Sequence, residues 1–190
     1  MSKKIAIFAS GSGSNAENIV SYFGSNSEFE FPLIISNKID AFVHERAKKM
    51  KIPSFTFSKN EFEDGKLIID LLKKYKIDGI VLAGFLLKVP KTIIETFAGK
   101  IINIHPALLP KYGGKGMYGD RVHAAVHAAG EKISGITIHY VNENYDEGNI
   151  IFQKECMLNS ADTPHSIAEK VHALEYEWFP KIVEKVFGGV

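Results

Sequence analysis

The sequence predicts an α/β fold with a mostly parallel central sheet and helices on both faces. Short runs of β-branched and aromatic residues alternate with segments of helical period, as in a succession of β-α-β units. Two of the runs, "DGIVLAGF" and "KIINIH", are predicted to form continuous apolar strands of the kind found in the buried middle of a parallel sheet. With 190 residues, 45% of them hydrophobic, we expect a single domain over residues 1–190.

The first half of the chain predicts three strands, each followed by a helix. The strands are "KIAIFAS", "FPLIIS" and the short "PSFTF". The first helix, "SNAENIVSYFG", begins with Ser14 three residues before Glu17, the spacing of a capping box. Asp40 is the expected cap of the second helix, "DAFVHERAKKM". The third segment, "NEFEDGKLIIDLLKKY", is expected to form one continuous helix.

The second half predicts an antiparallel hairpin and a long C-terminal helix. A short helix near "RVHAAVHAAG" precedes two strands, "GITIHYV" and "NIIFQKECML", whose brief link "NENYDEG" favours antiparallel pairing at the sheet edge. The last helix should begin at Asp162 or Thr163, with Pro164 in its first turn.

The composition narrows the classes of partner. Twenty-three basic against 22 acidic residues leave a formal charge of +1, so we expect neither a nucleic-acid nor a membrane partner. The longest apolar segment, "GIVLAGFLLKV", is too short to span a bilayer. The single Cys156 excludes an intramolecular disulfide, and we expect a reduced, cytoplasmic setting.

A glycine-rich turn after the first strand is the first candidate site. Backbone N–H groups at the start of a helix converge on one spot and favour an anion, so this loop is expected to bind phosphate. Two alternatives remain: the pattern G-x-G-x-x-A also fits a dinucleotide site, although Asp40 comes late for its carboxylate, and a tight turn alone would need glycine. The residues concerned are Gly11, Ser12, Gly13, Ser14 and Asn15.

Asn103 and His105 form the second candidate, at the end of the strand "KIINIH". Residues two apart project from the same side of a strand, and the carboxyl ends of parallel strands face the ligand crevice. An amide can hold an oxyanion and an imidazole can transfer a proton, so the pair suits attack of an amine on a carbonyl carbon. The structural alternative is that Asn103 pins a turn and His105 packs before Pro106.

Asp146, in the turn before the last strand, is the third candidate. If the hairpin folds back, its carboxylate should orient the ring of His105 and raise the pKa of that ring; otherwise Asp146 only forms the turn. His123 and His127, four residues apart, more often form an exposed helix face than a metal site, and we expect no metal. His139 is expected to be a packed or cross-strand residue.

In this order the motifs resemble the folate-dependent formyltransferases. The resemblance rests on "GSGSN", "SNK.DAF", "LAGF", "NIHPALLPKY", "GKGMYG..VH" and "D.G.II" and covers essentially the whole chain. It implies a Rossmann-like fold and transfer of a formyl group from 10-formyltetrahydrofolate, as co-substrate, to the amino group of glycinamide ribonucleotide in purine biosynthesis. Residues 1–100 would form the nucleotide- and phosphate-binding half, and residues 101–190 the catalytic and folate-binding half.

The resemblance also implies residue roles. Asn103, His105 and Asp146 would be catalytic, and Gly11, Ser12, Gly13, Ser14, Asn15, His172 and Glu175 would bind the phosphate and ribose. The folate site would comprise Leu86, Leu87, Lys88, Val89, Asn103, Asn142, Glu143, Asn144, Tyr145 and Asp146. Arginines that some members place in the region of "SKNEFEDGK" and after "LAGF" are missing here, and the loop 111–119 should order over bound nucleotide.

Other functions remain open from the sequence. A formyltetrahydrofolate hydrolase or methionyl-tRNA formyltransferase would share the catalytic residues, but usually carries a further domain that we do not expect here. A nicotinamide-dependent oxidoreductase would use the glycine loop alone, as would a non-catalytic nucleotide-binding module. We expect a monomer or a homodimer.

Overall fold

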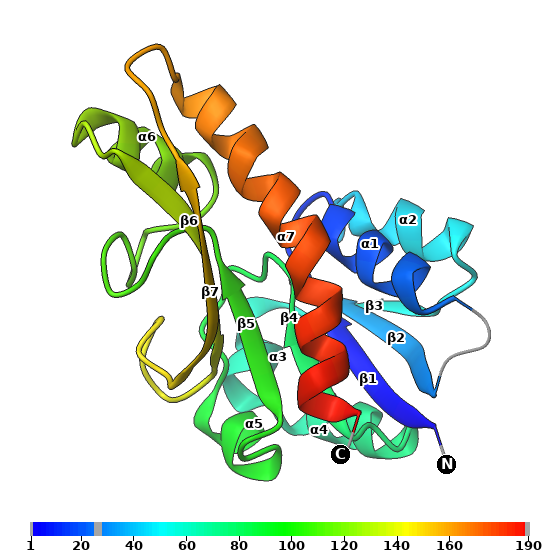
Figure 1. Cartoon of the computed structure of the whole chain (residues 1–190). Helices are drawn as coiled ribbons and strands as arrows, with labels where there is room; N and C mark the ends of the chain where they lie inside the picture. Colours follow the sequence, from blue (N-terminus) through cyan, green and yellow to red (C-terminus); the bar gives the residue numbers. More distant parts are fainter. Residues whose placement is uncertain (1, 25–27, 189–190) are drawn as a thin grey trace.

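A computed structural model describes residues 2–24 and 28–188, and these form one seven-stranded sheet with the strand order β3-β2-β1-β4-β5-β6-β7. The strands β3, β2, β1, β4 and β5 run parallel, and β6 and β7 continue the sheet in antiparallel pairing. The predicted fold class, including the hairpin and the long last helix, is confirmed (Figure 1).

The elements follow the expected alternation. The strands are β1 (Lys3–Phe8), β2 (Phe29–Ser36), β3 (Ser54–Thr56), β4 (Gly79–Leu82), β5 (Ile101–His105), β6 (Ile133–Tyr140) and β7 (Ile150–Met157). The helices are α1 (Ser14–Phe23), α2 (Val43–Lys49), α3 (Lys59–Asp64), α4 (Lys66–Lys74), α5 (Lys91–Thr96), α6 (Asp120–Ala128) and α7 (Pro164–Phe187). Among the described residues, no helix is long and apolar enough to cross a membrane.

Each face of the sheet has its own hydrophobic core. Neighbouring residues of β1 point to opposite faces, so Ile7 packs under α1, α2, α6 and α7, whereas Phe8 packs under α3, α4 and α5. Figure 1 shows α7 crossing one face beside α1, with α3, α4 and α5 on the other side. Because both faces are covered, β4 is apolar throughout, and β5 is apolar except for Asn103 and His105.

Two expected helix caps are wrong. Helix α1 begins after Gly13, which has a φ of 75° and makes no side-chain cap, and Glu17 instead pairs with Arg46 of α2. Helix α2 begins three residues after Asp40, with Phe42 in the capping position. At α7 the expected Thr163 is the cap, and it exchanges hydrogen bonds with Ser166 in a capping box.

The expected single helix at residues 60–75 is two helices, α3 and α4. Gly65 lies between them with a φ of 73°, outside the helical region, and a Cβ there would come within 2.5 Å of the Thr92 hydroxyl. The break therefore lets the chain pass close to α5. Helix α5 itself was not anticipated, because its six residues are too few for a clear helical period.

The topology creates a crevice at one edge of the sheet. From β1 the chain winds outward through β2 and β3, and then returns to β4 on the other side of β1. At such a reversal the loops after neighbouring strands diverge and leave a crevice at the strands' carboxyl ends. Here these loops are the glycine turn after β1 and the segment after β4.

Candidate functional site

The crevice contains a cavity of about 410 Å³ at the carboxyl ends of β1, β4 and β5, within the usual range of small-molecule sites. It brings together most of the predicted site residues from both halves of the chain. These are Gly11, Ser12, Gly13, Ser14, Asn15, Leu86, Asn103, His105, Tyr145, Asp146, His172 and Glu175.

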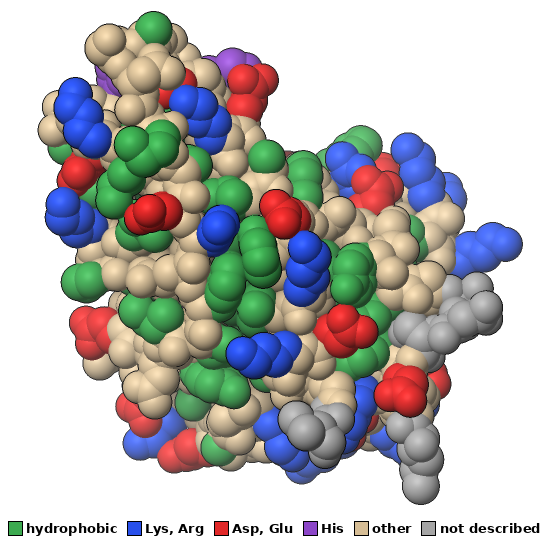
Figure 2. Space-filling view, viewed as in Figure 1, with side chains coloured by type: hydrophobic (Ala, Val, Ile, Leu, Met, Phe, Trp, Pro, Cys, Tyr) green, Lys and Arg blue, Asp and Glu red, His purple; other side chains and the backbone are tan. Residues whose placement is uncertain are grey.

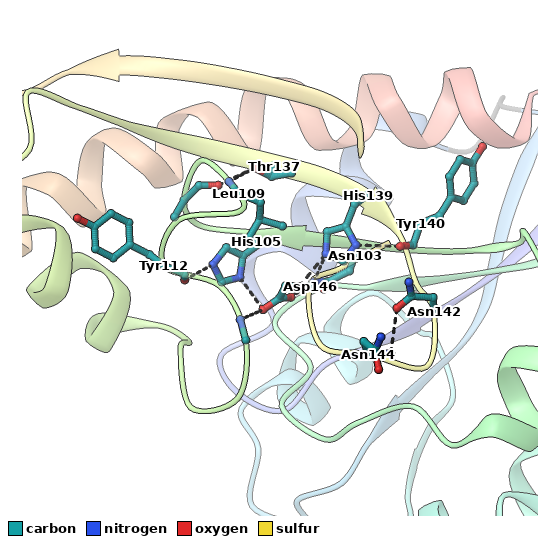
Figure 3. A network of polar contacts seen from close by, with 12 residues as sticks. Asn103, His105, Leu109, Tyr112, Thr137, His139, Tyr140, Asn142, Asn144 and Asp146 are labelled. Atoms are coloured by element: carbon teal, nitrogen blue, oxygen red, sulfur yellow. Dashed lines mark hydrogen bonds and ion pairs between the residues drawn. The ribbon is translucent and has the colours of Figure 1, made fainter. Parts of the chain in front are cut away.

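Asp146 contacts both Asn103 and His105 at the end of β5 (Figure 3). One oxygen of Asp146 is 3.5 Å from Nδ1 of His105, and the other is 3.5 Å from Nδ2 of Asn103. Asp146 has a φ of 55°, a left-handed conformation that aspartate adopts more readily than most residues. The turn after β6 thus directs this carboxylate back toward β5.

Backbone groups from the loop after β5 complete the arrangement. Nε2 of His105 donates to the carbonyl oxygen of Tyr112 at 2.7 Å, and the N–H of Gly114 donates to Asp146 at 2.9 Å. Both ring nitrogens of His105 therefore face oxygen acceptors, which is the arrangement that a doubly protonated ring requires.

His139 is a site residue that the sequence analysis missed. It is buried on β6 directly opposite Asn103, and its Nε2 lies 3.1 Å from the Asn103 amide nitrogen and 3.6 Å from Asp146. The alternation of "ITIHY" correctly indicated a cross-strand position. It could not indicate which residue would be the partner, because the register between β5 and β6 depends on tertiary structure.

Burial is the largest single influence on both pKa values of the pair, but it sets the net direction only for His105. It lowers the pKa of His105 below the ordinary value, although Asp146 and the Tyr112 carbonyl act in the opposite direction. The expectation that Asp146 would raise this pKa is right for its own contribution and wrong for the net direction. Burial would raise the pKa of Asp146, but His139, His105 and the Gly114 N–H together lower it, so the carboxylate is ionised at neutral pH.

The glycine turn lies across the cavity from this pair. A Cβ on Gly13 would come within 2.4 Å of Val43, so the close approach of the turn to α2 requires glycine. The side chain of Asn15 donates to Glu175 at 2.9 Å, and His172 contacts the same carboxylate oxygen at 2.8 Å. This hydrogen bond raises the pKa of His172. The Oδ1 atom of Asn15 is buried without a partner among the described residues.

A second cavity, of about 570 Å³, adjoins the first and shares Lys115 and Tyr145 with it. It contains the remaining predicted folate residues Leu87, Lys88, Val89 and Glu143. Asn142 and Asn144 line neither cavity. Both are exposed and are bonded within their own turn. Asn142 accepts from the Asn144 N–H (Figure 3), and the side-chain amide of Asn144 donates to Glu147.

Further residues of the first cavity were not singled out for this site by the sequence analysis. His123, at the start of α6, is buried, and its ring meets that of His172 edge to face at 6.0 Å. Burial lowers the pKa of His123, and its Nδ1 has no partner among the described residues. Arg121 is the only arginine among the residues that line this cavity, and it lies outside the two segments in which some relatives place arginines.

No group of three or more side chains that could hold a metal ion occurs in the described part of the chain. His123 faces the cavity, whereas His127, one turn later, is exposed. The two rings that the sequence had raised as a metal pair therefore lie in different surroundings, one buried and one exposed.

Comparisons with known proteins agree on one family. Residues 3–183 match the formyl transferase family. The phosphoribosylglycinamide formyltransferase of Bacillus subtilis is 38% identical over 191 residues, covering 98% of this chain and 95% of that protein. Glycinamide ribonucleotide transformylase 1 from Geobacillus kaustophilus has a TM-score of 0.90 at 31% identity, covering 98% of this chain and 100% of that one. The phosphoribosylglycinamide formyltransferase from Streptococcus pneumoniae has a TM-score of 0.86 at 35% identity, covering 97% of this chain and 99% of that one.

Proposed function

Since the chain belongs to the formyl transferase family, we propose that it transfers the formyl group of 10-formyltetrahydrofolate to the amino group of glycinamide ribonucleotide, a step of purine biosynthesis. The observation that carries the proposal is that Asn103, His105 and Asp146 lie in the same cavity as the glycine turn. A reacting carbonyl and a phosphorylated acceptor would therefore be held within one site.

Asn103 and His105 stabilise the oxyanion in this proposal. The substrate amine attacks the formyl carbon, and negative charge develops on the formyl oxygen. One N–H of the Asn103 amide is held by His139, while the other makes only a 3.5 Å contact with Asp146. The Nδ1 atom of His105 makes an equally long contact with Asp146. The amide of Asn103, and the Nδ1–H of His105 when its ring is protonated, can therefore turn to the oxyanion, and such donors act strongly in a site that excludes water.

Asp146 and His105 also manage the proton. The amine loses a proton after attack, and the folate nitrogen must gain one before it leaves. A buried imidazole beside an ionised carboxylate can pass such a proton, directly or through water, because the carboxylate stabilises the protonated ring. The lowered pKa of His105 keeps that proton easy to release.

The other end of the cavity suits the ribonucleotide. Backbone N–H groups at the start of α1 favour the phosphate, and the carboxylate of Glu175 can accept hydrogen bonds from ribose hydroxyls. Glu175 is almost fully buried, so its position is set by Asn15 and His172 and not by solvent. Arg121 adds a positive charge to this cavity, in a chain that lacks the arginines that some relatives carry in two other segments.

We assign the folate to the region between the two cavities. Leu86 and Tyr145 are in the first cavity, and Leu87, Lys88 and Val89 lead into the second. Apolar side chains on these segments suit a flat ring system, and the lysines of the second cavity suit the carboxylates at the other end of the folate. Asn142 and Asn144 can contribute only through the backbone of their turn.

The proposal is tested by measuring folate turnover with three acceptors. Purified protein receives 10-formyltetrahydrofolate with glycinamide ribonucleotide, with methionyl-tRNA or with water alone, and the folate product is followed by absorbance. We expect rapid turnover only with the ribonucleotide. Equal turnover in water would indicate the hydrolase, and turnover that requires the tRNA would indicate the other transferase.

Two further expectations remain part of the proposal. The unpaired, half-buried Cys156 supports a reduced, cytoplasmic setting. A complete set of candidate catalytic residues within one chain supports an enzyme that works as a monomer, or as a homodimer with one site in each copy.

A further inference from the structure

The geometry of the His105–Asp146 pair depends on a short backbone segment outside any helix or strand. The Tyr112 carbonyl accepts from His105 at 2.7 Å, and the Gly114 N–H donates to Asp146 at 2.9 Å. A shift of the segment 112–114 would therefore move both partners of the pair. What holds this segment thus also determines how the imidazole and the carboxylate lie relative to each other.

The backbone of this segment is not in a conformation that it would hold by itself. Tyr112 has a φ of 57° and Gly114 a φ of 92°. The left-handed conformation costs a residue with a Cβ roughly 1–2 kcal/mol, so interactions elsewhere must stabilise it at Tyr112.

Packing beneath the segment is incomplete. A cavity of about 310 Å³ lies along residues 107–112, and its opposite wall includes Val126, Glu131 and Ser134. Apolar contact therefore fixes the segment only in part: Tyr112 packs against the core, while the space along residues 107–112 stays open. A polar connection adds to this packing, from Glu131 to the side chains of Lys111 and Tyr112.

Glu131 lies between α6 and β6 and holds two consecutive side chains of the segment. One of its oxygens accepts from the Tyr112 hydroxyl at 2.9 Å and from the Lys111 ammonium at 2.9 Å. Hydrogen bonds from Lys111 and then Tyr112 lower the pKa of Glu131 below the ordinary value, so it is ionised at neutral pH. A charged acceptor strengthens both bonds.

We propose that Glu131 is a positioning residue: by holding Lys111 and Tyr112, it keeps the Tyr112 carbonyl on His105 and the Gly114 N–H on Asp146. The inference rests on the proposed function for its catalytic meaning. Glu131 itself contacts neither His105 nor Asp146, so it acts on them only through the backbone between Lys111 and Gly114.

The consequence for His105 has a definite sign. The Tyr112 carbonyl accepts a proton-bearing nitrogen and so favours the protonated ring, against the effect of burial. Loss of this acceptor leaves burial less opposed, and the pKa of His105 falls further. The other titratable groups around the ring are Asp146 after β6, His139 on β6, His123 on α6 and Glu175 on α7, and none of them contacts Glu131.

The test compares Glu131→Ala with wild type by two measurements. We expect kcat to fall about fivefold to tenfold with KM for both substrates within about twofold, as for loss of one orienting hydrogen bond. In nitrogen NMR of histidine-labelled protein, with the His105 signal assigned from His105→Ala, the His105 titration should move to lower pH. Glu131→Gln keeps an acceptor for Tyr112, so its kcat and its His105 pKa should lie between those of wild type and Glu131→Ala.

The matched control is Glu177→Ala, which removes a carboxylate paired with Lys181 on the exposed side of α7 and should change neither measurement. Tyr112→Phe removes only the hydroxyl, and should lower kcat and the His105 pKa even if Glu131→Ala does not fold. An unchanged His105 titration with a lowered melting temperature would overturn the inference. If wild type transfers no formyl group, the proposed function fails, but the titration still decides the role of Glu131.

Discussion

The amide of Asn103 is held between two side chains that come from other parts of the chain. His139 faces it from β6 at 3.1 Å, and Asp146 faces it from the following turn at 3.5 Å. Nδ1 of His139 lies 2.9 Å from the Tyr140 carbonyl, an acceptor, so this nitrogen carries the hydrogen. In the neutral ring the other nitrogen carries no hydrogen, so it can accept from Asn103 and fix the direction of the amide, whereas in the protonated ring the same nitrogen donates to Asp146 and lowers the pKa of that carboxylate.

We expect His139→Ala to lower kcat between about twofold and tenfold, because an unanchored amide spends part of its time turned away from the oxyanion. KM for the ribonucleotide should stay within about twofold, since His139 does not line the cavity. Steady-state kinetics beside His127→Ala, which removes an exposed histidine of α6, would measure this. An equal loss in both variants would argue against the anchoring role.

Single residues were predictable where their chemistry is local. Asn103 and His105 stand at the end of an apolar strand, and that position alone suggested a site. The role of His139 depends on the register of β6, and the net pKa of His105 depends on burial by the whole fold, so neither could be derived from neighbouring residues.

The N-terminal end of α7 is held by side-chain hydrogen bonds of three neighbouring residues, Asp162, Thr163 and Ser166. Thr163 and Ser166 form its capping box, and Asp162 accepts from Lys170 at 2.6 Å, from the Asn159 N–H at 2.8 Å and from Ser166 at 2.8 Å. These bonds favour the ionised form and lower the pKa of Asp162 to about 2. The same helix presents His172 and Glu175 to the cavity, so its first turns help to place them.

This pKa predicts a change of stability with pH. An unfolded aspartate titrates near 3.9, so the contribution of Asp162 is present above about pH 4 and is lost as the pH falls toward about 2. As the pH is lowered from about 4 toward about 2, the free energy of unfolding, measured by denaturant titration at each pH, should therefore decrease less steeply in Asp162→Asn than in wild type. Asp70→Asn, at an exposed position of α4, is the control and should keep the wild-type slope.

The strands were easier to predict than the helix ends. Apolar runs identified β4 and β5 because burial on both faces leaves a strong pattern. The caps predicted at Ser14 and Asp40 were wrong because tertiary packing determines where these helices begin. Gly13, which precedes α1, packs directly against Val43, the first residue of α2. Gly65 lay inside an otherwise helical pattern, and only the approach of α5 shows why the chain breaks there.

At the scale of the whole molecule, the sheet order explains where the site lies. The crevice at the reversal between β1 and β4 follows from the alternation of strands and helices, so its edge of the sheet was predictable. The contribution of α7 was not: Glu175 bonds Asn15 across 160 positions of the sequence, and only the family resemblance suggested it. Lysine, arginine and acidic side chains are interspersed over the face that carries α7, in keeping with a net charge of +1 (Figure 2).

In the proposed reaction, the groups at the end of β5 perform the chemistry while the glycine turn and α7 hold the ribonucleotide. The most direct measurement pairs kcat for formyl transfer with calorimetric binding of glycinamide ribonucleotide, in wild type, Asn103→Ala and His105→Ala. Loss of an oxyanion donor should lower kcat roughly a hundred- to a thousandfold, with the Kd of the ribonucleotide within about threefold. Variants that keep wild-type kcat, or that lose it only because the ribonucleotide no longer binds, would contradict the claim.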